Sequence, residues 1–461
     1  MDQIRLYWKH ATAAAVGERH GVADKDLKAL APQIKALTRT LNDERKAGKH
    51  AYRDLPYDDD VTDAIHRQVE HFRDRCEVLV VLGVGGGALA SRALQQALNP
   101  YTYNYTSDRT RPGPQVFVVD NVDPDQVRSL LDLVAAKAKK TIVNVVSKSG
   151  DTVETMTQYF LFRGLLQSKL GKKYNENVLA TTDATDGGTL RQLAKSEGYR
   201  TLDVPAGVEG RFGALSALGL FSAALTGIDV DAIMAGARDM DKRCKDPDLM
   251  ANPAALIAAM HYLLLPKGRT ISVLMPYSAA LFALGDWYRQ LLAESLGKNG
   301  AGITPMTALG ATDQHSQVQL FRDGPDDKLI TLLEVERFGS KLATSANTKS
   351  ATNLAYLNGS NLQTIINSQK LATEHALLAS GRPTLSLLFP QVSPETVGQF
   401  IYLYQAVVAY LANLMGVDAY STPAVALGKQ GAAALMGQGS YGELLGQMQA
   451  TVTKRDAKFL V

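Results

Sequence analysis

The 461-residue sequence is short of cysteine, has no dominant charge and contains no uninterrupted apolar run of membrane-spanning length. Its two cysteines, Cys76 and Cys244, show neither CxxC nor Cys/His spacing, which argues against a disulfide scaffold or zinc site and fits a reducing compartment. Lys and Arg number 49 against 46 Asp and Glu, a balance not typical of nucleic-acid or membrane-surface proteins. An anionic ligand would therefore have to meet locally placed cations.

The N-terminal residues 1–19 mix charged with apolar side chains and lack the apolar core of a secretion signal. The most apolar long segment, residues 397–415, is interrupted by Gln399, Gln405 and Asn413. These polar interruptions favour a buried core helix over a membrane span. We therefore expect a soluble, cytoplasmic protein without a membrane or nucleic-acid partner.

What the sequence does contain is a β/α alternation that runs twice, as expected for a chain long enough for two domains. The expected strands are short and apolar: 77–82, 115–119, 141–146, 178–182, 200–204, 270–275, 329–335 and 384–389. The expected helices lie between and after them: 88–98, 125–136, 153–170, 214–225, 279–296, 361–379 and 394–415. Continuous apolar strands alternating with helices predict two doubly wound parallel sheets, preceded by a helical segment to about residue 51. In such sheets ligands bind at the carboxyl ends of the strands.

The loop at residues 83–88 (GVGGGA) follows a strand and opens a helix, so its backbone N–H groups could bind an anion. It also matches the G-x-G-x-x-A form of a dinucleotide fingerprint. That fingerprint requires an acidic residue about 20 residues later, whereas the second strand ends only at Asp120. Anion binding, dinucleotide binding and a structural tight turn all remain open for this loop.

A second loop, residues 147–152 (SKSGDT), gathers three hydroxyls, one ammonium group and free N–H groups at a helix start. This is the chemistry of a phosphate-monoester cradle, although a capped helix start has the same composition. Lys148 stands outside a GxxxxGK[ST] frame, so a nucleoside-triphosphate loop is not indicated.

Further candidates come from four other segments. Arg211 lies between glycines and could stabilise an oxyanion. Gln290 and Glu294 are one helical turn apart near a helix C-terminus, where the dipole would raise the pKa of a carboxyl and suit a general base. His315 in a polar loop and Lys429 near the C-terminus have no neighbouring metal ligands, and each alone has an ordinary structural explanation.

In this order the motifs resemble the glucose-6-phosphate isomerase family in its compact bacterial form, from about residue 52 to 429. The parallels are GVGGGALA, SKSGDTVET, GRFGALSALGL, AESLGK, GATDQHSQVQ and ALGKQ, of which AESLGK and the DQHSQ part are the most specific. The resemblance implies two sugar-isomerase (SIS) domains, at 52–226 and 227–420, with a helical segment at 1–51 and a C-terminal segment at 421–461. It also implies a homodimer, a sugar-phosphate substrate, and neither a metal nor any other cofactor.

The resemblance assigns substrate-phosphate binding to the second loop, through Ser147, Lys148, Ser149 and Thr152. It places the glycine loop, with Gly86 and Gly87, along the sugar. Glu294 would be the catalytic base with Gln290 beside it, and Arg211 would face the enediolate with Glu154 as a supporting carboxylate. His315, from across the dimer interface, and Lys429 would assist ring opening.

Several positions depart from the family pattern: Gly87 for serine, Gly150 and Asp151 for threonine-rich residues, Glu209 for glycine, Gly213 for serine and Thr422 for a glutamine near the phosphate. These changes predict weaker phosphate binding or an altered sugar preference. The alternatives are therefore an isomerase of another sugar phosphate such as mannose 6-phosphate, a non-catalytic SIS-domain sensor, and a nicotinamide-dependent enzyme.

Overall fold

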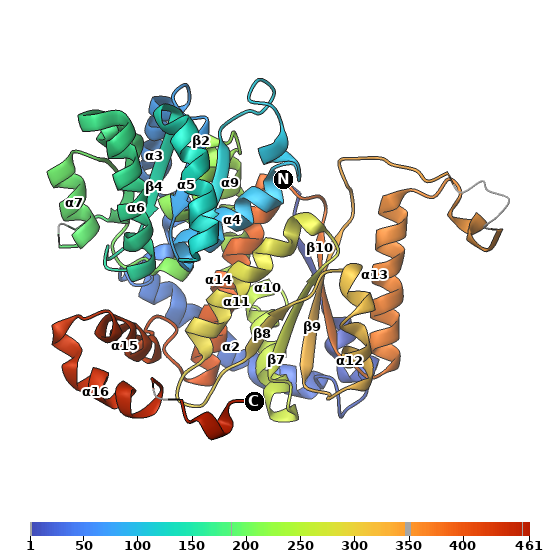
Figure 1. Ribbon diagram of the computed structural model, residues 1–461. Helices are drawn as coiled ribbons and strands as arrows, with labels where there is room; N and C mark the ends of the chain where they lie inside the picture. Colours follow the sequence, from blue (N-terminus) through green and yellow to red (C-terminus); the bar gives the residue numbers. More distant parts are fainter. Residues whose placement is uncertain (1, 186, 346–351, 454) are drawn as a thin grey trace.

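The computed structural model describes residues 2–185, 187–345, 352–453 and 455–461. Two five-stranded sheets lie side by side, with helices packed around and between them (Figure 1). The predicted two-sheet α/β fold is thereby confirmed, and most expected elements are within a few residues of their predicted ends. The domain boundaries drawn from the sequence stay a prediction.

The first sheet is entirely parallel, in the order β3-β2-β4-β5-β6. Its strands are β2 (Val78–Leu82), β3 (Gln115–Val119), β4 (Thr141–Val146), β5 (Val178–Asp183) and β6 (Arg200–Val204). Along β2, alternate side chains enter two different apolar clusters. One face is covered by α5 (Pro124–Lys137), α6 (Val153–Leu170) and α7 (Thr189–Glu197), and the other by α3 (Asp59–Phe72), α4 (Gly86–Leu98) and α8 (Ala217–Leu225).

The chain continues from β2 to β3 on one side and later places β4 on the other side of β2. The loops after β2 and β4 therefore diverge from one point at the carboxyl end of the sheet, the place where doubly wound folds bind ligands. These are the glycine loop and the loop at 147–152.

The second sheet has the order β1-β10-β9-β7-β8 and is mixed, because the edge strand β1 runs antiparallel to β10. Its strands are β1 (Arg5–Tyr7), β7 (Ile271–Pro276), β8 (Thr304–Thr307), β9 (Lys328–Val335) and β10 (Thr384–Phe389). One face packs on α10 (Pro253–Leu264), α11 (Phe282–Leu296) and α14 (Pro394–Met415). The other packs on α12 (Val318–Asp323) and α13 (Leu362–Ala379).

Three expectations need correction. The N-terminal segment contains strand β1 ahead of its long helix α2 (Asp24–Lys46), and β8 had not been expected at all. A 3₁₀ helix at Gly210–Leu215 takes the first residues of the helix predicted from residue 214. β1 and β8 have only three and four residues, too few to show a periodic pattern, and β8 contains a proline that an edge strand tolerates.

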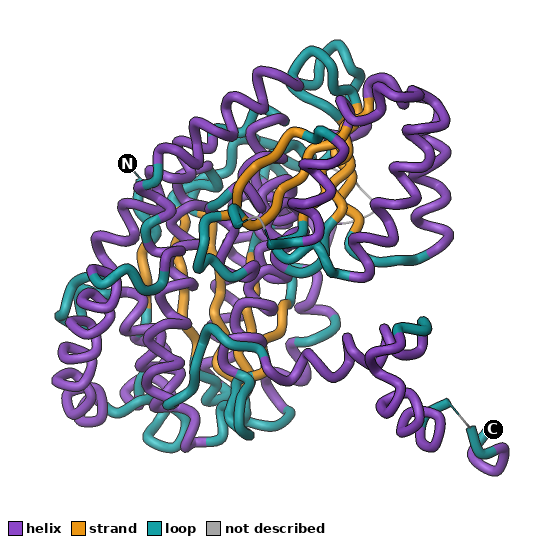
Figure 2. The backbone as a smooth tube through the Cα atoms, turned by 90° about the vertical axis from the view of Figure 1, so that its left-hand side faces the viewer, coloured by secondary structure: helices purple, strands orange, loops and turns teal. Residues whose placement is uncertain are grey.

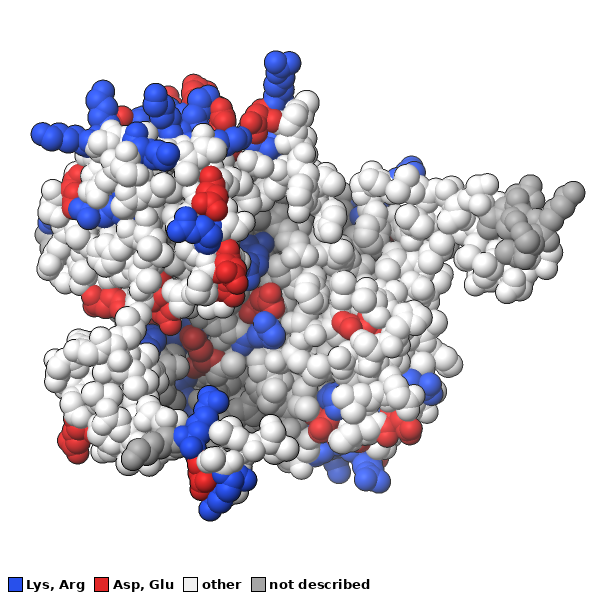
Figure 3. Space-filling view, viewed as in Figure 1, with Lys and Arg blue, Asp and Glu red and all other residues white. Residues whose placement is uncertain are grey.

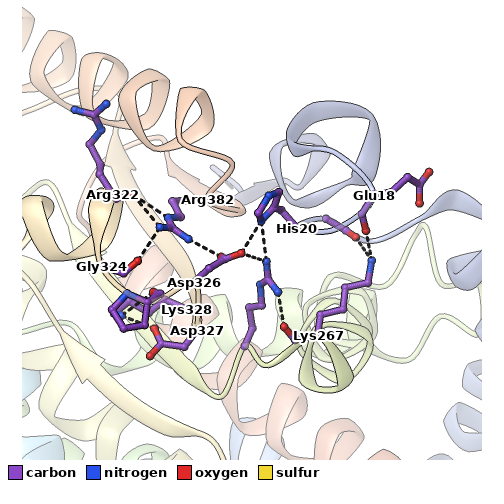
Figure 4. Close-up of polar contacts among 12 residues, drawn as sticks. Glu18, His20, Lys267, Arg322, Gly324, Asp326, Asp327, Lys328 and Arg382 are labelled. Atoms are coloured by element: carbon purple, nitrogen blue, oxygen red, sulfur yellow. Dashed lines mark hydrogen bonds and ion pairs between the residues drawn. The ribbon is translucent and has the colours of Figure 1, made fainter.

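A polar cluster fastens the N-terminal segment to the second sheet at the amino ends of its strands (Figure 4). The His20 Nδ1 atom lies 2.5 Å from Asp326 Oδ2, and Lys267 donates hydrogen bonds to the carbonyl oxygens of Glu18 and Gly21. Arg382 holds the other carboxylate oxygen of Asp326 at 2.9 Å. The cluster therefore lies away from the carboxyl ends of the strands, where ligands bind in doubly wound folds.

The helix α14 passes the length and hydropathy test for a membrane span, but 94% of its apolar window is buried inside the protein. It packs along α9 (Val230–Cys244), α10 and α11 between the two sheets. The prediction of a buried core helix is confirmed.

Candidate active site

The two loops that diverge from the first sheet line one pocket of about 580 Å³. The wall includes six residues predicted to bind the substrate: Gly86, Gly87, Ser147, Lys148, Ser149 and Thr152. In the same view as Figure 1, the surface is hollowed between the first domain, the second domain and the C-terminal helices, and charged side chains of both signs border the hollow (Figure 3). The described residues contain no cluster of three or more His, Cys, Asp and Glu side chains that could hold a metal ion.

The loop at 147–152 folds around its own hydroxyl groups. Ser147 Oγ accepts a hydrogen bond from the Gly150 N–H at 3.0 Å, and Ser149 Oγ accepts one from the Asp151 N–H at 3.2 Å. Because Ser149 Oγ acts as an acceptor here, it keeps a proton that it can donate to an anion. Ser147 Oγ also lies 3.4 Å from Thr152 Oγ1, so one of these two hydroxyls can donate to the other and the second can donate to an anion. Such donors, with the Lys148 ammonium group, suit a phosphate monoester.

The start of α7 packs against this loop and accounts for two departures. Gly150 has φ +77°, and a Cβ atom on it would lie 2.1 Å from the backbone nitrogen of Leu190. The Asp151 carboxylate accepts a hydrogen bond from Thr189 Oγ1 at 2.5 Å. Close packing of α7 therefore requires the glycine and gives the negative charge of Asp151 a local partner.

The glycine loop also serves close packing between segments. Gly85 has φ +59°, and a Cβ atom on it would lie 2.6 Å from Gln290 Nε2 of α11. A Cβ atom on Gly86 would lie 2.1 Å from the carbonyl oxygen of Gly210. The loop thus brings α11 and the Arg211 segment against the rim of the pocket.

Arg211 and Glu294 form the charged centre beside this rim. Arg211 is only 4% exposed, and its Nη1 atom lies 3.6 Å from Glu294 Oε2. Burial lowers the pKa of Arg211, while the nearby Glu294 opposes the shift. An arginine remains protonated even so, because its guanidinium group is the most basic side-chain group in proteins. Gln290 Nε2 donates to the other Glu294 oxygen at 3.3 Å, and 35% of the Glu294 side chain is exposed.

Two residues of the AESLGK motif support this centre and were not predicted from the sequence. Ser295 Oγ accepts a hydrogen bond from Arg211 Nε at 3.0 Å. Lys298 Nζ donates to the carbonyl oxygens of Glu294 and Ser295, both at 2.8 Å. Burial, followed by the charge of Arg211, lowers the pKa of Lys298. Its cation offsets the negative end of the α11 dipole, on which the sequence argument for Glu294 relied. In the sequence, the position of Lys298 one helical turn after Glu294 is the feature from which its supporting role could have been predicted.

His315 and Lys429 lie elsewhere. His315 is exposed at the end of the 3₁₀ turn Thr312–His315, which Gln314 anchors to Tyr277 and Thr373 on the α13 side of the second sheet. Since α11 packs on the opposite face of the second sheet, His315 and Glu294 of the same chain lie apart. A contribution of His315 across a dimer interface stays a prediction.

Lys429 is exposed on α15 (Ala426–Leu435), which packs with α16 (Gly442–Thr451) in an arm that projects from the body (Figure 2). Among the described side chains it has no hydrogen bond or ion pair with Glu294 or Arg211. Glu154 lies half-buried in the first turn of α6, two residues after Thr152. The structure thus joins the loop at 147–152, the glycine loop, Arg211, Gln290 and Glu294 into one region, and leaves His315 and Lys429 outside it.

Comparisons with known proteins decide the family. The sequence profile described as phosphoglucose isomerase matches residues 69–453. Glucose-6-phosphate isomerase of Carboxydothermus hydrogenoformans is 38% identical over 96% of both chains. That of Rubrobacter xylanophilus is 36% identical over 91% of this chain and 96% of the relative. The chain belongs to the phosphoglucose isomerase family.

Solved structures agree on the fold of the family. A hypothetical protein of Thermus thermophilus superposes with a TM-score of 0.83 at 32% identity, covering 94% of this chain and 100% of that chain. A glucose-6-phosphate isomerase of Chlamydia trachomatis has a TM-score of 0.70 at 23% identity, covering 84% of this chain and 76% of that chain. The family predicted from the sequence motifs is confirmed.

Within this family framework two more departures have local causes. A Cβ atom on Gly87 would lie 3.0 Å from Val146 Cγ1 and 3.2 Å from the Val146 carbonyl oxygen, so a serine requires β4 to shift. A Cβ atom on Gly213 would lie 2.4 Å from Leu218 Cδ1. Thr422 stands just before the 3₁₀ turn Pro423–Val425 that leads into the arm, and its side chain does not cap that turn.

Proposed function

We propose that this protein catalyses the reversible isomerisation of glucose 6-phosphate and fructose 6-phosphate through a cis-enediol(ate). The observation that carries the proposal is the pairing of Glu294 with buried Arg211 at the rim of a pocket built for an anion. We further propose that the reaction serves glycolysis and gluconeogenesis in the cytoplasm, without a metal or other cofactor.

The substrate phosphate would occupy the loop at 147–152, with Lys148 and the two serine hydroxyls as donors. The sugar then extends past Gly86 toward α11, so that C2 meets the exposed part of Glu294. This direction follows from the contact of the glycine loop with Gln290, one turn before Glu294.

In the chemical step Glu294 removes the C2 proton of the open-chain aldose and returns it to C1. The hydroxyl proton on O2 passes to O1 within the same enediol(ate), and the product is the ketose. The negative charge that develops on the enediolate oxygens is met by Arg211, which Ser295 and the Ala419 carbonyl already hold in place. Preorganised donors of this kind typically contribute about 2.7–4 kcal/mol each.

A coupled assay tests the activity directly. With fructose 6-phosphate and a chelator present, glucose 6-phosphate should form at a rate proportional to the protein added, because no step requires a metal. A preparation of Glu294→Gln made in the same host measures contaminating isomerase. Turnover of mannose 6-phosphate above that of glucose 6-phosphate would instead identify the alternative substrate. No turnover of either sugar would refute the proposal.

Ring opening is proposed to require a homodimer, in which Lys429 and the His315 contributed by the other copy exchange protons with the sugar. If so, mixing inactive Glu294→Gln and His315→Ala proteins creates heterodimers with one intact site. Random exchange at equal amounts should restore about a quarter of wild-type activity. Absence of recovery after subunit exchange has been verified, for example by mass-tagged copies, would contradict this arrangement.

A further inference from the structure

The charges that line the phosphate-loop pocket are unusual for a site that takes a dianion. The pocket wall contains one cation, Lys148, together with the carboxylates of Asp151, Asp183 and Glu209. A phosphate monoester near neutral pH carries a charge between about −1.5 and −2, so it would be repelled by any carboxylate left unpaired beside it. The partners of each carboxylate therefore decide how the pocket receives its ligand.

The carboxylates of Asp151 and Asp183 each accept a hydrogen bond from a nearby residue. Asp151 accepts the hydroxyl of Thr189, and Asp183 Oδ1 accepts the backbone N–H of Thr185 at 3.0 Å. The first contact joins the loop at 147–152 to the start of α7, and the second lies within the loop that leads from β5 toward α7. Both can persist when a ligand enters, so these two carboxylates serve the local fold.

Glu209 differs from these two carboxylates, because its side chain forms an ion pair with Lys148, the cation of the pocket wall. The Glu209 Oε1 atom lies 3.3 Å from Lys148 Nζ, and the side chains are 42% and 29% exposed. Glu209 precedes the 3₁₀ helix Gly210–Leu215 with φ −74° and ψ 148°, an extended conformation that any residue can adopt. The glutamate is therefore not needed for the backbone, and its carboxylate occupies the cation that the phosphate requires.

We propose that Glu209 sets the substrate affinity of this site by standing in for the phosphate on Lys148 when the pocket is empty. This inference rests on the proposed function. An ion pair as exposed as this one is weak, so a phosphate that also receives hydroxyl and N–H donors from the loop can displace it. Displacement leaves Glu209 unpaired next to the ligand, which raises KM and speeds release of the product. Glu209 pairs with Lys148 at the loop where the phosphate would bind. Its charge also acts on Arg211, more weakly than that of Glu294, so we expect its replacement to change KM much more than kcat.

Glu209→Gln and Glu209→Ala test this proposal by two measurements. Calorimetric titration with inorganic phosphate should show a Kd about 3- to 10-fold lower than wild type, and KM for fructose 6-phosphate should fall in parallel. The value of kcat should stay within about twofold, or fall slightly if product release becomes limiting. Glu176→Gln is the matched control, since it removes the same charge from an exposed ion pair, with Arg75, at the amino end of β5.

A double-mutant cycle with Lys148→Ala separates competition for the cation from general repulsion. Lys148→Ala alone should raise KM and the phosphate Kd about 10-fold or more, because it removes a charge-assisted contact. In that background the gain from Glu209→Gln should largely disappear. A gain of the same size without Lys148 would contradict the competition.

Unchanged or weaker phosphate binding by Glu209→Gln would overturn the proposal, because Glu209 would then be neutral or would orient Lys148 for binding. The phosphate titration does not depend on turnover. It therefore tests Glu209 even if the coupled assay finds no isomerase activity, and the two failures can be told apart.

Discussion

Replacing Glu294 with glutamine should lower kcat by about 10²- to 10⁴-fold and leave KM within a few-fold of wild type. Glutamine has the same shape but cannot accept the C2 proton, whereas the loop at 147–152, where we propose that the phosphate binds, is left intact. The direct measurement is deuterium wash-in at C2 from heavy water, followed by NMR. Isomerisation and exchange should be lost together.

Asp286→Asn is the matched control for this variant. Asp286 is another carboxylate on α11, two turns before Glu294, and is paired with Arg289 at 2.7 Å. Its replacement should leave both kcat and exchange close to wild type. Exchange retained in Glu294→Gln with a normal rate would show that another group removes the proton.

Replacing Arg211 with lysine should be nearly as harmful, lowering kcat by about 10²- to 10³-fold although a positive charge is kept. The guanidinium group holds three partners at once: Glu294, Ser295 Oγ and the carbonyl oxygen of Ala419, the last at 2.6 Å. One ammonium group cannot reach all three. Because buried acceptors then lose their donors, the free energy of unfolding should also fall by about 1–3 kcal/mol.

Kinetics and denaturant unfolding of Arg211→Lys, measured on the same preparation, separate the two effects. Ser295→Ala removes only the Nε contact and should cost less on both scales. If Arg211→Lys loses stability while kcat under folding conditions matches wild type, then Arg211 is structural and does not stabilise the intermediate.

The sequence predicted most of the fold because the strands other than β1 and β8 are short, mostly apolar runs between helices. It predicted that the loop at 147–152 lies at a ligand pocket, because a loop after a parallel strand is recognisable by its place and composition. The role of this loop in phosphate binding stays a prediction. Ser295 and Lys298 were missed because their value depends on Arg211, a residue from another segment. A local sequence pattern does not reveal such contacts between side chains from distant segments.

The glycine loop is a second example of contacts that the sequence alone does not reveal. From the sequence, its glycines could equally serve an anion, a dinucleotide or a turn. The structure shows a further reason, since Gly85 and Gly86 leave room for Gln290 and the Gly210 carbonyl. Likewise, the places of His315 and Lys429 away from Glu294 could not be inferred from motifs that the family carries as a set.

The hydrogen bond from Arg211 to the Ala419 carbonyl has a mechanical consequence. Ala419 is buried just before the point where the chain leaves the body to form the arm that carries Lys429. The root of this arm is therefore fastened by the residue that faces Glu294. Any movement of the arm that displaces its root should therefore change the electric field at the Glu294 carboxylate, the proposed base.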